Sequence, residues 1–154
     1  MIGQQQKNQA EKWFKDLRDK ICEEFEILEE DHLKLAPKSD VAAKKFERKS
    51  TIRETDDKED GGGGVMATLK DGRIFEKVGV NVSAVYGKLA PEAQKSITAR
   101  KAIPELKDDP RFWASGISLV AHMRNPHTPA IHLNTRMFWT PHAWWFGGGT
   151  DLNP

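Results

Sequence analysis

The sequence predicts an α+β fold in which an antiparallel β-sheet is flanked by helices. Near the amino terminus apolar residues recur at helical spacing, and after the glycine run at 61–64 they alternate with polar residues. Several strand candidates then follow one another with short connections. Strands joined in this way pair antiparallel, and a sheet with one apolar face needs helices packed on it. At 154 residues the chain has the length of one ordinary domain.

The first predicted element is an amphipathic helix over residues 8–31. Apolar side chains recur there at intervals of three or four, with charged residues on the other faces; the stripe consists of Trp13, Leu17, Ile21, Phe25 and Leu28, with Phe14 beside them. The single cysteine, Cys22, falls inside this helix, where we expect it to contribute to packing.

Residues 40–60 are charged and mostly aperiodic, which predicts a solvated connection rather than a regular element. We therefore divide the chain in two. Residues 1–60 hold the amino-terminal helix and a charged linker, and residues 61–154 hold the predicted sheet.

The second part begins with a predicted hairpin. From residue 73 to 87 the apolar residues fall mostly on even positions, which is typical of a half-buried strand. Asp71 and Gly72 supply a turn signal before it, so residues 65–70 should pair with this strand.

A short helix and three strands complete the predicted elements. Residues 91–101 favour a helix with Pro91 in its first turn. Residues 114–123, 130–139 and 143–149 read as strands joined by short loops. Their order favours continued antiparallel pairing.

Composition and charge exclude several classes of protein. No apolar run reaches the roughly 18 to 20 residues that span a bilayer, and a net charge of +1 gives no strong field for nucleic acid. Residues 1–60 hold 13 Lys+Arg against 16 Asp+Glu, whereas residues 61–154 hold 11 against 7. The second part is therefore mildly basic, which suits a small polyanionic ligand.

The amino-terminal segment has neither the apolar core of a secretory signal nor an Arg-rich transit pattern. One cysteine excludes an internal disulfide and agrees with a reducing compartment. We expect a cytoplasmic protein without integral membrane contact and without a nucleic-acid partner.

The chemically informative stretch runs from Ser118 to Arg136. If residues 117–123 and 130–138 form a hairpin, alternation sorts their side chains onto two faces. One face is apolar except for Thr135. The other carries five polar groups, which are Ser118, His122, His132, Asn134 and Arg136. We expect a register centred on His127, with residue 122 opposite 132, 120 opposite 134 and 118 opposite 136.

Polar strand faces usually meet only water, but such faces tend to use Thr, Lys and Glu. Two His, an Asn, a Ser and an Arg without an acid can donate hydrogen bonds to carboxylates and transfer protons near neutral pH. This composition favours a carboxylate-rich ligand. His122 and His132 also suggest a metal site, although zinc normally takes at least three protein ligands. His127 and His142 lie beside prolines and fit turns better.

The two glycine runs argue against nucleotide binding. Residues 61–64 lack the Lys-Ser/Thr pair of a P-loop, and residues 147–149 lead into Thr150 and Asp151 instead of a Gly-rich helix start. Glycines beside a strand permit close approach of a flat ligand or another backbone. Asp151, just after them, can accept N–H donors.

Three segments occur together and in order: GGGGVMATLKDGRIFEKVGVNVSAVYG, SGISLVAHMRNPHTPAIHLNTRMFW and WWFGGGTDLNP. Together they resemble the core of the oxygen-dependent coproporphyrinogen oxidase family over nearly all of residues 61–154, whereas residues 1–60 match weakly. The resemblance implies an incomplete half of that family's fold, with residues 61–154 as the amino-terminal part of its catalytic domain.

The resemblance also implies an activity. Family members use O2 as co-substrate to convert two propionates of coproporphyrinogen III to vinyl groups, giving protoporphyrinogen IX in haem biosynthesis, and they need no organic cofactor. It implies catalytic roles for His132 as proton donor, Arg136 as propionate anchor and Asp151 as partner of the pyrrole N–H groups. Substrate contacts fall to Ser118, Asn134, Thr135 and Arg136, and some bacterial members are described with a divalent metal at positions matching His122 and His132.

Family members continue for about as long again, adding two candidate histidine ligands and the segment linked to homodimer formation. Activity of the 154-residue chain alone is therefore an open question. The alternatives are an inactive fragment or a tetrapyrrole-binding module without turnover, and a structural domain that forms oligomers.

Overall fold

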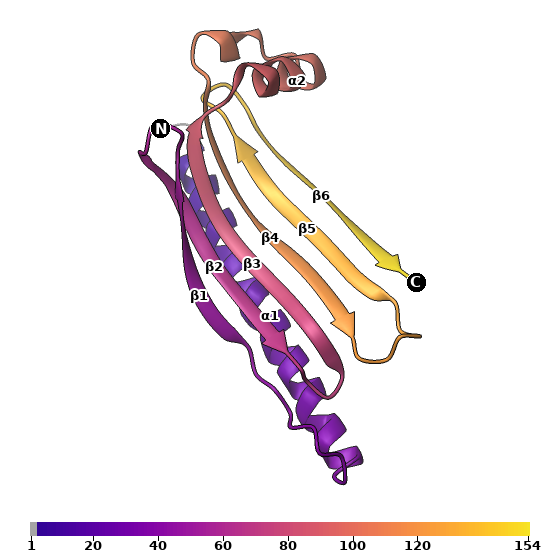
Figure 1. Cartoon of the computed structure of the whole chain (residues 1–154). Helices are drawn as coiled ribbons and strands as arrows, with labels where there is room; N and C mark the ends of the chain where they lie inside the picture. Colours follow the sequence, from indigo (N-terminus) through magenta and orange to yellow (C-terminus); the bar gives the residue numbers. More distant parts are fainter. Residues whose placement is uncertain (1–2) are drawn as a thin grey trace.

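A computed structural model describes residues 3–154, which form a six-stranded sheet with a long helix on one face and a short helix at one end (Figure 1). The elements are α1 (Gln4–Leu35), β1 (Glu47–Glu54), β2 (Asp60–Lys70), β3 (Phe75–Lys88), α2 (Pro91–Lys101), the 3-10 turn η1 (Pro104–Lys107), β4 (Arg111–Met123), β5 (Ala130–Trp139) and β6 (Trp144–Asn153). Strand order follows the chain, and every neighbouring pair is antiparallel. The predicted α+β class is confirmed.

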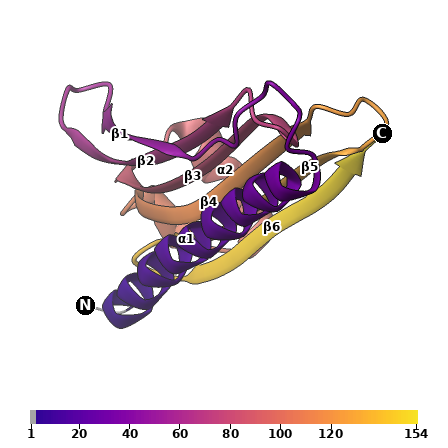
Figure 2. The ribbon, with the colours of Figure 1, turned by 90° about the horizontal axis from the view of Figure 1, so that it is seen from below.

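Helix α1 packs along one face of the sheet, as Figure 2 shows. The predicted helix is confirmed and extends further at both ends. The side of α1 that is buried differs slightly from the predicted apolar stripe. Phe14 is 1% exposed, whereas Trp13, which was predicted in the stripe, is 60% exposed. Cys22 packs in the core as expected, and burial raises the pKa of its thiol to about 11. No helix in residues 3–154 has the length and apolarity that a membrane crossing requires.

The core lies between α1 and the central strands. Even positions of β3 and odd positions of β4 point toward the helix, which confirms the predicted alternation; the buried residues of these two strands include Val78, Val80, Val82, Ile117, Leu119 and Ala121. The opposite face of the same strands carries the polar residues. The sheet therefore has one covered face and one open face.

Residues 40–60 are not a solvated connection throughout, because residues 47–54 form β1. This strand pairs with β2 from Glu47 opposite Thr68 to Ile52 opposite Gly63. Sequence alternation gave no sign of β1, since every one of its residues is exposed. A side chain at Gly63 would collide with the Thr51 carbonyl oxygen, so the glycine run lets these backbones approach closely. The predicted division after residue 60 falls inside this hairpin, at the first residue of β2.

The register predicted for the β4–β5 hairpin is wrong by two residues. Ser118 pairs with Asn134, Val120 with His132, and residue 116 with 136. The loop contains a tight turn, in which the Thr128 N–H donates to the Asn125 carbonyl at 3.1 Å, and the strands are centred on residue 126 instead of 127. A shift of two residues leaves every side chain on its predicted face, because side chains alternate with a period of two.

Candidate functional site

The predicted site lies on the face of the sheet opposite α1, called here the open face. Figure 1 looks onto it, with α2 at one end. Directly paired residues in neighbouring strands point to the same side of a sheet. The registers therefore arrange the polar side chains of β3 to β6 in parallel rows across the open face.

The middle row consists of hydrogen-bonding groups. Asn81 on β3 pairs with Ser118 on β4, which pairs with Asn134 on β5, which pairs with Gly149 on β6. The Asn81 side-chain oxygen is buried and has no hydrogen-bond partner among the described residues. A buried polar atom without a partner is uncommon in a folded protein. This row offers donors and acceptors to a ligand lying on the sheet.

The next row contains the predicted proton donor and acid. His132 on β5 pairs with Asp151 on β6, and Nδ1 of the imidazole lies 3.7 Å from Oδ1 of the carboxylate. That distance is too long for a direct hydrogen bond. Both side chains are partly open, at 39% and 54% exposure, so a ligand can reach them. Asn153 Nδ2 also donates to Asp151 Oδ1 at 3.4 Å.

Arg136 lies one row beyond Asn134, toward α2. It pairs with Gly116 on one side and Gly147 on the other, so no side chain competes with it on the neighbouring strands. It is exposed and forms no ion pair within residues 3–154. It lies four positions beyond His132 along β5, which is about 13 Å in a strand. An unpaired guanidinium is suited to a carboxylate.

Glycines keep the open face flat. No described atom lies within 4 Å of the position that a Cβ would take at Gly79, Gly147 or Gly149. By their pairing, these three glycines belong to the same rows as the polar groups. Side chains there would project into open space instead of packing, so their absence leaves room for a flat ligand.

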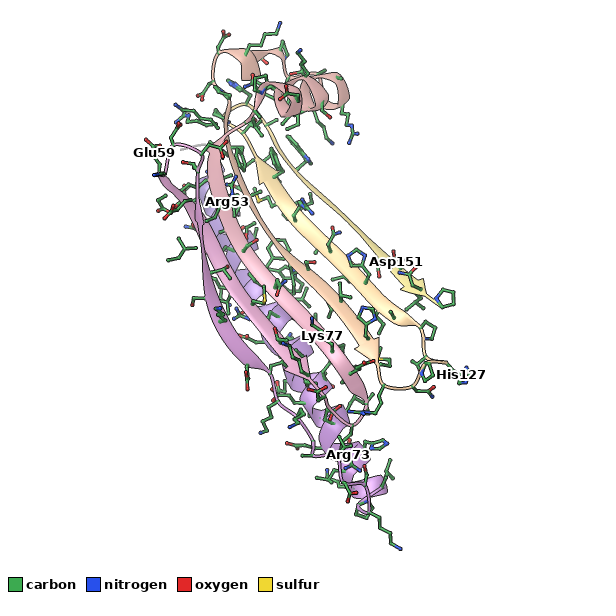
Figure 3. All side chains as sticks on the ribbon, in the orientation of Figure 1. Arg53, Glu59, Arg73, Lys77, His127 and Asp151 are labelled. Atoms are coloured by element: carbon green, nitrogen blue, oxygen red, sulfur yellow. The ribbon has the colours of Figure 1, made fainter. Side chains whose placement is uncertain are left out.

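Two of the predicted site residues lie outside these three rows. Thr135 pairs with the buried Ile117, so its side chain points to the α1 side, away from Asn134 and Arg136. His122 lies on the open face, opposite Lys77 of β3, in the row beyond His132. Figure 3 shows Lys77 and Asp151 on β3 and β6 and His127 in the loop at the far end.

The residues present do not make a metal centre by themselves. Within residues 3–154 no group of three His, Cys, Asp or Glu is placed to hold a metal ion, and a zinc site normally takes at least three protein ligands. The prediction of a metal at His122 and His132 stays a prediction. His127 and His142 occupy turns, where their backbone N–H groups donate to Asn125 Oδ1 and Thr140 Oγ1, respectively.

Sequence reasoning missed the contribution of α2. Arg100 and Lys101 from its last turn line a pocket of about 540 Å³ together with Arg136 and Trp145. A row of stacked rings crosses the sheet at this end: Phe112 and Phe138 lie 5.7 Å apart, and Phe138 and Trp145 lie 5.0 Å apart. Asn81 was also missed. Its place in the strand alternation, on the same face as the glycines, was the available signal.

The amino-acid sequence is similar to those of one family of proteins. A family model described as Coproporphyrinogen III oxidase matches residues 9–154. Oxygen-dependent coproporphyrinogen-III oxidases of Rickettsia peacockii (strain Rustic) and Rickettsia bellii (strain RML369-C) are 47% and 44% identical over 142 residues, which is 92% of this chain. The protein of that name in Rickettsia felis is 46% identical over 145 residues, or 94% of this chain. The chain spans only 45–46% of the length of these relatives.

Proposed function

Since the chain belongs to the coproporphyrinogen III oxidase family, we propose that its open face binds coproporphyrinogen III and serves the oxygen-dependent conversion of two propionates to vinyl groups. The product is protoporphyrinogen IX, and the pathway is haem biosynthesis. The observation that carries this proposal is the placement of His132, Arg136 and Asp151 on one face, with glycines between them.

Each group has a role that its chemistry supports. Arg136 holds a propionate carboxylate through charge-assisted hydrogen bonds. Asp151 accepts hydrogen bonds from pyrrole N–H groups, which are donors in the reduced macrocycle. His132, whose Nδ1 lies 3.7 Å from Asp151 Oδ1, acts as the proton donor. Ser118 and Asn134 supply further hydrogen bonds from the middle row. Thr135 contributes through its neighbours on β5.

The overall reaction balances without an organic cofactor. Each propionate loses CO2 together with one proton and two electrons from the carbon next to the pyrrole, and O2 takes up these and one further proton from solvent to become hydrogen peroxide. The electron-rich pyrrole reacts with oxygen itself in this scheme. The protein's contribution is therefore to orient the propionate and to hold charges where they stabilise the reacting groups.

The experiment supplies the 154-residue chain with coproporphyrinogen III in air and measures protoporphyrinogen IX as protoporphyrin fluorescence after oxidation. Arg136→Ala should lower kcat/KM about 10- to 100-fold, because a lost charge-assisted contact costs about 1.5–3 kcal/mol. Lys49→Ala, which removes an exposed cation from β1 at the other edge of the sheet, is the control. An unchanged rate in Arg136→Ala would remove this residue from the mechanism.

One observation favours a second candidate, a tetrapyrrole-binding module without turnover. The chain spans 45% of the length of an oxidase that it matches. Tight binding of coproporphyrin III without vinyl product would support the module. Absence of both binding and product would reject both candidates.

The proposal extends to three properties of the complete enzyme. We propose a homodimer in the cytoplasm, with a divalent cation at His122 and His132 that takes its remaining ligands from outside residues 3–154. No step above depends on the cation. Analytical ultracentrifugation of the longest natural protein that contains these residues tests the homodimer. Metal analysis of the same protein tests the divalent cation.

A further inference from the structure

We propose that Arg100 and Lys101 of α2 bind a carboxylate of the substrate, so that together with Arg136 they form a three-cation anion site at the α2 end of the open face. The inference rests on the proposed function, because it deepens the account of how the same face holds an acidic macrocycle. The carboxylate belongs to a propionate other than the one next to His132.

The charges around the pocket support this assignment. Arg100, Lys101 and Arg136 line one pocket of about 540 Å³, and of the described residues around it none is acidic. None of the three forms an ion pair within residues 3–154. Three cations gathered without a counter-charge repel one another, so an anionic ligand lowers the energy of the arrangement.

A cation–π contact links α2 to the sheet. Lys101 Nζ lies 5.2 Å from the centroid of the Trp145 ring, a cation–π distance. Trp145 stacks on Phe138 in the row of rings. The last turn of α2 therefore lies against β6 at the pocket that Arg136 also lines, and the rings form an apolar wall against which the edge of a macrocycle can pack.

The floor of the pocket is built from glycine. Gly147 and Gly149 line it, and a Cβ at either position would meet no described atom within 4 Å. Space therefore remains beneath the three cations for a carboxylate and the carbons that carry it. The site is separated from His132 by about 13 Å along β5. A macrocycle with four propionates can place one at each end of this distance.

A second pocket differs in its charges. It has a volume of about 550 Å³, lies beside the β1–β2 turn and is lined by five acidic side chains together with four cations: Glu54, Asp56, Asp57, Glu59 and Asp60, and Lys7, Arg53, Lys88 and Arg111. Figure 3 shows Glu59 at this turn, near Arg53 and away from Asp151. The acids there offset the cations, whereas the α2 pocket has cations and no acid in its lining, so its charge is the better match for a ligand with several carboxylates.

The experiment measures binding of coproporphyrin III, the stable oxidised form with four carboxylates, by fluorescence titration of the 154-residue chain. The double variant Arg100→Gln/Lys101→Gln should bind it about tenfold more weakly, with a shallower dependence on salt. Lys95→Gln/Lys107→Gln removes the same charge from exposed positions on α2 and η1 that do not line the pocket, and should change affinity less than about twofold. The tetra-amide of coproporphyrin III, which has no carboxylates, should bind both variants equally.

Each outcome has a defined meaning. Wild-type affinity in Arg100→Gln/Lys101→Gln overturns the inference and leaves the proposed function standing. Equal losses for the acid and the tetra-amide also overturn it, because they would indicate a disturbed fold instead of a lost charge contact. Failure of the unmodified chain to bind coproporphyrin III, with no vinyl product, contradicts the proposed function itself.

Discussion

At the scale of single residues, two adjacent glycines of β6 face opposite sides of the sheet, so substitutions at them test ligand binding and stability separately. Gly149 faces the open side, where a Cβ would meet no described atom within 4 Å. A Cβ at Gly148 would instead collide with the Asn134 carbonyl oxygen and lie 2.8 Å from Thr135 Cα. The two positions therefore test different properties of the same strand.

Gly149→Val should leave the free energy of unfolding within about 0.5 kcal/mol, because its side chain projects into solvent. It should weaken coproporphyrin III binding about tenfold, since a branched side chain then occupies the flat face. Gly148→Val should show the reverse pattern, a loss of about 1–3 kcal/mol of stability from crowding. Urea unfolding and fluorescence titration of both variants measure these effects. A destabilised Gly149→Val with normal affinity would contradict the assignment of its face.

The sequence predicted which face of the sheet a site residue lies on wherever strand alternation alone determines that face. Ser118, His132, Asn134 and Arg136 share a face because they alternate along one hairpin, and this held although the register was two residues off. Asp151 joins them only through the pairing of β5 with β6. Register depends on how a loop closes, which residue types alone do not specify. Arg100 and Arg136 line the same pocket because of the path of α2, which no local pattern encodes.

At the scale of elements, Glu29 ties the end of α1 to the sheet. It is fully buried, and its carboxylate accepts hydrogen bonds from the backbone N–H groups of Arg73 at 2.6 Å, Ile74 at 2.8 Å and Phe75 at 3.0 Å. It also accepts one from Lys44 N at 3.3 Å. These bonds hold the β2–β3 turn and the segment before β1 against the helix.

The Arg73 side chain completes this connection. Its guanidinium donates to His32 Nδ1 at 3.1 Å and to the carbonyl oxygens of Ala36 and Val41, which lie at and beyond the carboxyl end of α1. Figure 3 shows Arg73 at this end of the molecule. Carbonyls at a helix end lack partners within the helix. The Arg73 side chain therefore supplies hydrogen bonds to carbonyl oxygens at the end of α1, while the Arg73 backbone N–H donates to Glu29.

Glu29→Gln should lower the free energy of unfolding by about 1–3 kcal/mol at pH 7, because an amide cannot replace a carboxylate toward four N–H donors. Burial alone would raise the pKa of Glu29, but the backbone hydrogen bonds from Arg73, Phe75, Ile74 and Lys44 hold it below its usual value. A lowered pKa in the folded state gives stability that is present above about pH 4.3 and is lost as the pH falls through the folded pKa. The difference between wild type and Glu29→Gln should therefore shrink in acid.

Urea unfolding at several pH values measures this effect. Glu30→Gln, which changes an exposed neighbour paired with Lys45 at 3.8 Å, serves as the control and should have little effect at any pH. A constant difference between wild type and Glu29→Gln from pH 7 to pH 3 would show that the ionised carboxylate is not the stabilising species.

Most of the elements were predictable from the sequence, and β1 was not. The α1 helix, the β2–β3 hairpin, α2 and the three later strands all appear where the pattern placed them. Strand β1 was missed because it is exposed on both sides and pairs with a glycine run that carries no pattern. The buried line of α1 includes Lys7, Arg18 and Glu29, so an apolar stripe alone could not locate it.

At the scale of the whole molecule, the two central strands of the sheet are packed under α1 on one face, and the two edge strands, β1 and β6, are exposed. Strands β3 and β4 each have a neighbour on both sides and carry much of the apolar core under α1. In β6, by contrast, every residue except Trp145 is exposed. Backbone amides that lie at an edge with few buried contacts open at a lower free energy than amides in a core. Stability should therefore vary across the sheet in the order of burial.

Native-state hydrogen exchange followed by NMR should accordingly show the slowest amides in β3 and β4 and faster exchange in β1 and β6. Coproporphyrin III should slow exchange at residues 147–151 of β6, which border the polar rows, and leave β1 unchanged, since β1 lies at the opposite edge. Protection of β6 equal to that of β4 in the free chain would contradict the open edge and would indicate that a second chain covers it. Comparing exchange at two protein concentrations separates these cases, because only association depends on concentration.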